Sequence, residues 1–183
     1  MNQYGLSARE LATCGLFGAA ALLLPTLFHL VRLGHVFMPM YLPLMVLAFF
    51  VRPLPAAATA AIVPLMSSLA TGMPPIYPPV APIMAVELAA MTALVAACRR
   101  RWPQAHVLVI LVPALVAGRV VYVALATAFA SVVELPTAFV AGLSFLSGWP
   151  GIALMLVTVP SIVRSAEAVR PVRHSAECPD ELA

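Results

Sequence analysis

Six long apolar segments follow one another along this chain, and their length limits what it can fold into. They cover residues 11–30, 36–51, 54–70, 83–98, 105–133 and 137–163. A helix needs about 20 apolar residues to cross the hydrocarbon core of a bilayer, and shorter or kinked spans fit inside a bundle. Because backbone groups in lipid must find their hydrogen bonds within the protein, such segments favour helices. We therefore expect an all-α membrane protein with six transmembrane helices in a compact bundle.

The composition excludes an ordinary soluble domain. Hydrophobic residues make up 63% of the 183 residues and charged residues 9%, whereas about a quarter of the residues in soluble domains are charged. The positive side of the net charge of +3 comes from arginine alone, because the chain has no lysine. The positions of the arginines explain this excess without a nucleic-acid partner.

The arginines are unevenly distributed between the two ends of the predicted spans. Cytoplasmic flanks of transmembrane helices collect positive charge. In a six-span arrangement one side holds Arg9, Arg52, Arg99, Arg100, Arg101, Arg164, Arg170 and Arg173. We therefore expect both termini in the cytoplasm. Residues 1–164 are predicted to form one transmembrane domain, and the polar residues 165–183 a disordered cytoplasmic tail.

A proline-rich stretch, TGMPPIYPP at residues 71–79, separates the third segment from the fourth. Its four prolines lack backbone donors and have fixed φ angles, so it predicts a stiff loop, which the topology places on the external face. Irregular backbone at membrane depth is tolerated where it is buried in protein or lines a cavity. The loop is therefore either a wall or lid of a binding site or a rigid connector between two helices.

Two charged residues lie inside the apolar segments. Glu87 is about one turn from the external end of the fourth segment, and Arg119 is near the middle of the fifth. Charged side chains in hydrocarbon cost at least a few kcal/mol each, so they usually pair or face a cavity. Because their depths differ by about two turns, a pair needs helix tilt or a bridging water. They predict either a contact that holds two helices together or a polar anchor for a ligand.

Further candidate ligand-binding residues gather in the external half. Histidines beside an arginine can hydrogen-bond a ligand, and methionine and aromatic side chains suit a bulky, partly aromatic molecule. The complete candidate set is His29, Arg32, His35, Met40, Tyr41, Ser67, Met73, Tyr77 and Glu87. The histidines have too few neighbouring ligands for a structural metal site, and the three cysteines lack C-x-x-C spacing. We therefore expect no metal and no cofactor.

Small residues recur at four-residue spacing on three segments, which lets helices approach closely in lipid. The pairs are Cys14 with Gly18, Gly15 with Ala19, Ala56 with Ala60 and Ala57 with Ala61, and the fourth segment carries Ala85, Ala89, Ala93 and Ala97. These faces serve either the bundle itself or a partner membrane subunit.

An enzyme is the competing class. Ser67 or Ser68 with His29 or His35 would supply the nucleophile and base of an intramembrane hydrolase. The chain lacks G-x-S-x-G, H-E-x-x-H and P-loop motifs, and no acid lies near either histidine in sequence to orient it. We therefore expect a protein that is not an enzyme, with the hydrolase as the alternative.

Four motifs carry a resemblance to a known family. They are HVFMPMYLP at residues 35–43, PLMSSL at 64–69, TGMPP at 71–75 and MAVEL at 84–88. Together with the length and the number of predicted spans, they make the chain similar to the substrate-binding (S) components of energy-coupling-factor (ECF) transporters. Members of this family are small six-helix proteins that capture vitamins or related micronutrients from outside the cell. The resemblance therefore implies high-affinity vitamin uptake across the bacterial cytoplasmic membrane.

The resemblance also implies partners and sites. In this family the ligand pocket lies in the external half and is gated by the connections after the first and third helices, here residues 29–35 and 71–82. A membrane scaffold subunit with two ATPases powers transport, although it is shared or absent in some systems. It docks on small residues, here Gly15, Ala19, Ala57 and Ala61. Cobalamin or a precursor is one candidate ligand, and His29 or His35 would then have to ligate cobalt because the external half has no cysteine.

Overall fold

The computed structural model describes residues 7–30, 39–77, 79–133 and 149–169. Within these ranges it holds six helices and no strand. The helices are α1 (Ala8–Leu30), α3 (Tyr41–Ala48), α4 (Pro53–Thr71), α5 (Val80–Arg101), α6 (Val107–Val133) and α8 (Trp149–Val169). The all-α prediction is therefore confirmed for this part of the chain.

Five helices in the described ranges are long and apolar enough to cross a membrane, namely α1, α4, α5, α6 and α8. Their outward surfaces carry large apolar side chains that are more than half exposed, such as Leu16, Leu69, Val120 and Val157. A soluble protein seldom exposes so much apolar surface, whereas lipid tails accept it. The structure thus supports a multi-pass membrane protein.

α3 is shorter than the span predicted at residues 36–51, of which 36–38 lie outside the described part. It has eight residues and rises about 12 Å, less than the thickness of the hydrocarbon core. Pro39 lies just before it, and the chain leaves the helix through a turn at Phe49 and Phe50. All of its residues except Leu42 are buried, so α3 forms the centre of the bundle.

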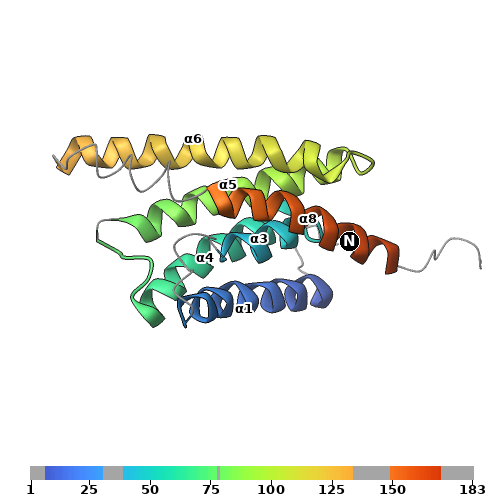
Figure 1. Ribbon diagram of the computed structural model, residues 1–183, viewed down its shortest axis with the longest axis horizontal. Helices are drawn as coiled ribbons and strands as arrows, with labels where there is room; N and C mark the ends of the chain where they lie inside the picture. The colour runs from blue at the N-terminus through green and yellow to red at the C-terminus, as the bar shows by residue number, and fades with distance from the viewer. Residues whose placement is uncertain (1–6, 31–38, 78, 134–148, 170–183) are drawn as a thin grey trace, which may run out of the picture.

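The long helices run side by side along the long axis of the molecule (Figure 1). α1 and α6 lie at opposite edges, α4 pairs extensively with α5, and α3 packs against α1, α4, α5 and α8. The side chains of Leu44, Met45 and Leu47 fill the centre without exposed surface. The proline-rich stretch joins α4 to α5 at one end of the bundle, and the three arginines of residues 99–101 form the last turn of α5 at the other.

α8 differs from the sixth predicted segment at both ends. Residues 137–148 of that segment lie outside the described part, and the helix begins at Trp149. It continues to Val169, so residues 165–169 of the predicted polar tail are helical. Glu167 in this last portion pairs with Arg99 at the end of α5. A charged contact thus holds the helix to the bundle beyond the apolar part of its sequence.

Candidate functional site

Three polar residues from three helices meet in the middle of the bundle, and we call them the buried polar cluster. The hydroxyl of Tyr41, on α3, donates a hydrogen bond of 2.5 Å to Oε2 of Glu87, on α5. The nearest guanidinium nitrogen of Arg119, on α6, lies 3.9 Å from the other carboxylate oxygen of Glu87. The same guanidinium lies over the Tyr41 ring, with 5.7 Å between its central carbon and the ring centroid, a cation–π distance. Glu87 and Arg119 therefore approach directly, in spite of their different positions along their helices.

The cluster is deeply buried. Glu87 has no exposed surface, Tyr41 is 1% exposed, and the side chain of Arg119 is 22% exposed. A carboxylate removed from water needs charge and hydrogen-bond partners, which Arg119 and Tyr41 supply here. Among the described residues Oε1 of Glu87 nevertheless has no hydrogen-bond partner, because 3.9 Å is an ion-pair distance and too long for a hydrogen bond. This oxygen keeps the capacity to accept a donor from a bound molecule.

Close contact between α5 and α6 explains how the two charges meet. Gly118 immediately precedes Arg119, and a β-carbon added to it would lie 2.0 Å from Sδ of Met91. Met91 is one turn beyond Glu87 on α5 and is buried. A β-carbon here would force the buried Met91 side chain to move, so Gly118 allows α6 to pack closely against α5 beside Glu87. Gly118 was not among the residues predicted from the sequence, although a glycine next to a charged residue in the middle of a span indicates close helix packing.

The proline-rich loop is tied to both helices that it joins. Gly72 ends α4 with a φ of 72°, in the left-handed region that favours glycine, and its N–H donates to the carbonyl of Ser68 at 2.9 Å. The Ser67 hydroxyl donates to the carbonyl of Met73 at 2.8 Å. On the other side, the N–H of Ala81 donates to the carbonyl of Pro75 at 3.1 Å. These bonds agree with the prediction of a stiff loop.

The structure brings together some of the predicted ligand-binding residues and separates others. Tyr41 and Glu87 are in contact, and Met40, beside Tyr41, is buried. Met73 is 49% and Tyr77 is 74% exposed, so these two side chains lie at the surface of the loop and away from the cluster. Ser67 is buried and bonded to the loop backbone.

Three predicted residues remain without a described side chain. His29 lies in the last turn of α1, but only its backbone is described, and Arg32 and His35 lie outside the described residues. Any role for these residues stays a prediction. In the described part, no group of three His, Cys, Asp or Glu side chains is placed to hold a metal ion.

The small-residue pairs divide into an inner and an outer set. Cys14 and Gly18 face α4, where a β-carbon on Gly18 would meet the Thr59 methyl group at 3.4 Å. By contrast, a β-carbon on Gly15 would have no atom within 4 Å, and Ala19 is exposed. On α4, Ala56 and Ala60 are fully buried, whereas Ala57 and Ala61 are half-buried. The predicted docking residues on α1, Gly15 and Ala19, thus belong to the outer set, and those on α4, Ala57 and Ala61, are half-buried.

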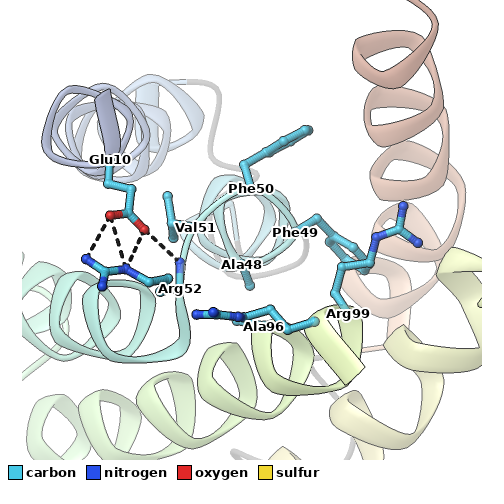
Figure 2. A pocket seen from close by; sticks show the side chains of 9 residues that line it. Glu10, Ala48, Phe49, Phe50, Val51, Arg52, Ala96 and Arg99 are labelled. Carbon is cyan, nitrogen blue, oxygen red and sulfur yellow. Dashed lines mark hydrogen bonds and ion pairs between the residues drawn. The ribbon is translucent and has the colours of Figure 1, made fainter. Parts of the chain in front are cut away.

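A second polar site occupies the arginine-rich end of the bundle. The Arg52 guanidinium donates to the Glu10 carboxylate, with Nε–Oε1 and Nη2–Oε2 distances of 2.9 Å. This pair joins the start of α1 to the start of α4, and the hydrogen bond to Glu10 raises the pKa of Arg52. A pocket of about 190 Å³ opens beside it (Figure 2). We call it the arginine pocket; it is lined by Arg52, Arg99, Arg100 and Glu10, and by apolar side chains of Ala96 and residues 48–51.

Comparisons with protein-family models, curated proteins and solved structures found no match. The buried polar cluster, the tied loop and the arginine pocket are therefore the observations from which a function can be argued.

Proposed function

We propose that this protein is the membrane-embedded substrate-binding subunit of an ECF-type transporter in the bacterial cytoplasmic membrane. The five long helices and the segment that contains the short α3 together cross the membrane six times with both termini inside, and the protein binds a vitamin or a related micronutrient from outside. The observation that carries the proposal is the Glu87 carboxylate, fully buried among helices that can cross a membrane and with one oxygen open to a further donor. Ionisable residues at such positions typically mark the path or site of a solute.

The cluster has the parts that a solute anchor requires. The hydrogen bond from Tyr41 fixes the orientation of the Glu87 carboxylate, and Arg119 balances its charge. In the proposed complex, an N–H or O–H group of the ligand donates a hydrogen bond to Oε1 of Glu87. Buried apolar residues such as Met40 and Met91 pack against the remaining part of the ligand. Cobalamin or a precursor is one candidate among vitamins.

The direction of binding follows from the two ends of α5. Tyr77, in the loop, and the triple arginine at residues 99–101 are separated by the full helix, which is about 33 Å long. If the arginines face the cytoplasm, the loop faces outward and covers the external end of the site. The exposed Gly15 and Ala19 on α1 offer a flat surface for the scaffold subunit, which with its ATPases would power release to the inside.

The alternative of an intramembrane hydrolase has weaker support. A serine nucleophile needs a base to take its proton. The Ser67 hydroxyl instead donates to the carbonyl of Met73, where it holds the loop. Ser68 is buried as well. The Ser67 bond favours a structural role for this serine, and we therefore prefer a binding role for the protein.

Ligand-dependent stabilisation tests the proposal. Purified protein is heated with a panel of vitamins and corrinoids, and a true ligand stabilises it by about 2.7 kcal/mol at a hundred times its dissociation constant. The Glu87→Gln variant should lose most of this gain, while Glu167→Gln, far from the cluster, should keep it. If no compound shifts the melting temperature and a serine-reactive probe labels Ser67 or Ser68, the hydrolase replaces the binding protein.

A further inference from the structure

The arginine pocket lies at the opposite end of the bundle from the proline-rich loop, so it is separate from the proposed solute site. Its lining residues come from three parts of the chain: the start of α1, the end of α3 with the turn before α4, and the end of α5 (Figure 2). The end of α8 lies beside Arg99. Its lining combines three arginine side chains and the Glu10 carboxylate with apolar residues, among them Phe49, Val51 and Ala96.

Ion pairs hold two of the three arginines in place. Arg52 is fixed by Glu10, as Figure 2 shows. Arg99 reaches toward α8, where it pairs with Glu167, and it also donates to the carbonyl of Ala105 at 3.1 Å. The side chain of Arg100 makes no hydrogen bond or ion pair with any other residue of the described part. With both carboxylates counted, the pocket keeps one uncompensated positive charge, and that charge is carried by Arg100.

This combination suits an anion with several oxygen atoms. Arginine offers a planar fork of donors that matches phosphate oxygens, and it remains charged at any physiological pH. The apolar part of the lining reduces the screening of charge by water, so an anion in the pocket is attracted more strongly than at an open surface. A cation would meet one carboxylate in the lining, that of Glu10, which is already paired with Arg52.

The surroundings of the pocket place it at the surface of a membrane. Leu54, two residues after Arg52, is 77% exposed, and Leu11, next to Glu10, is also largely exposed to the lipid side. Trp102, just beyond the triple arginine, is exposed with the Arg101 guanidinium 5.9 Å from its ring, and tryptophan gathers at membrane–water boundaries. Basic pockets between helices at this level bind the head groups of anionic lipids.

We infer that the arginine pocket binds a phosphate group, with Arg100 as its principal charge partner. The group belongs either to the head of an anionic phospholipid or to a soluble phosphate in the adjoining aqueous phase. Bound there, it links the start of α1 and the α3–α4 turn to the end of α5.

Native mass spectrometry with matched variants tests this site. The full chain is purified with equal amounts of phosphatidylglycerol and phosphatidylcholine, and retained lipids are counted for the wild type, Arg100→Gln and Arg101→Gln. Arg101 is one residue away but does not line the pocket, so it controls for general surface charge. In a parallel measurement, inorganic phosphate is compared with chloride at equal ionic strength for its effect on the melting temperature.

A lipid source predicts that the wild type and Arg101→Gln retain phosphatidylglycerol, and that Arg100→Gln retains about fivefold less. A soluble source predicts no selective lipid retention but a rise in melting temperature with phosphate that Arg100→Gln abolishes. Either result supports the site. Equal behaviour of the wild type and Arg100→Gln in both measurements, or equal losses in the two arginine variants, overturns it. Circular dichroism confirms that each variant is helical before it is scored.

Discussion

Glu87 is a charged residue buried in the core of the described part. Its carboxylate is fully buried, one oxygen is bonded to Tyr41, and the Arg119 guanidinium lies 3.9 Å from the other. Removing one member of such a group leaves the others buried without a partner, which costs more than the group contributes when intact. The free energy of unfolding should therefore respond differently to different replacements of the same residue.

We predict that Glu87→Ala lowers the free energy of unfolding by about 3 kcal/mol, since it removes the acceptor of the buried Tyr41 hydroxyl and the carboxylate that pairs with Arg119. Glu87→Gln retains an acceptor for Tyr41 and should cost less. Denaturant unfolding of the purified protein in detergent measures both values. Glu10→Gln provides the comparison, because its partner Arg52 is partly exposed and such pairs contribute about 1 kcal/mol or less. Equal effects of Glu87→Ala and Glu10→Gln would contradict the view of Glu87 as a coupled buried group.

Gly118 is the residue that sets the distance between α5 and α6. We predict that Gly118→Ala destabilises the protein by about 1–3 kcal/mol, because the new methyl group overlaps Met91. Gly15→Ala is the matched control, since open space surrounds its β-carbon position and alanine is the better helix former. Thermal unfolding should rank Gly118→Ala below the wild type and Gly15→Ala level with it or above. Adding Met91→Ala to Gly118→Ala should recover part of the loss, and strict additivity of the two changes would refute the contact.

At the scale of the helices, apolar length predicted the long elements well. The segments at 54–70 and 83–98 correspond to α4 and α5, and those at 11–30 and 105–133 to α1 and α6. The length of the apolar segment did not predict α3 correctly, because this sequence, with prolines near its start, forms a short buried helix. Apolar length also did not predict where α8 ends. The helix continues to Val169, and Glu167 in its last part pairs with Arg99, which is 68 positions away and cannot be recognised as a partner from the local sequence.

The buried polar cluster could be predicted only in part, because its contacts also join residues that are far apart in the sequence. Glu87 and Arg119 stood out because charge is costly in an apolar segment, and Tyr41 was named as a possible ring partner for a ligand. Its bond to Glu87 joins residues 46 positions apart, so spacing along the chain could not predict it. The arginine pocket could not be predicted because its residues come from three parts of the chain, and in the sequence each part looks like an ordinary charged end of a span.

The proline-rich loop between α4 and α5 is the element that we expect to affect ligand binding more than stability. We predict that replacing both Pro74 and Pro75 by alanine weakens retention of the ligand severalfold while the melting temperature without ligand changes little. The reason is that prolines limit the freedom of the loop before binding, whereas its bonds to Ser67 and Ala81 use backbone carbonyls that alanine retains. Ligand dissociation rates and unfolding curves of the double variant measure the two effects. Parallel losses in stability and in binding would indicate a connector with no part in the site.

At the scale of the whole molecule, the distribution of arginines and the fold together predict how the protein is oriented in the membrane. The loop containing Tyr77 and the turn after the triple arginine lie at opposite ends of α5, so only one of them can face the outside. Positive flanks remain in the cytoplasm because moving them across the membrane is unfavourable. We therefore predict that the end of the bundle with the loop faces the outside and that the end with the arginine pocket faces the cytoplasm.

Cysteine labelling in intact cells tests this orientation. In a background with Cys14, Cys98 and Cys178 replaced by alanine, Tyr77→Cys should react with a membrane-impermeant maleimide, since this side chain is 74% exposed in the loop. Gln104→Cys, exposed in the turn between α5 and α6, should react only after the cells are opened. Labelling of Gln104→Cys from outside, with Tyr77→Cys protected, would place the arginine pocket at the external surface and leave the loop facing the cytoplasm. The solute would then have no outward route to Glu87 through the loop, and uptake as proposed would be excluded.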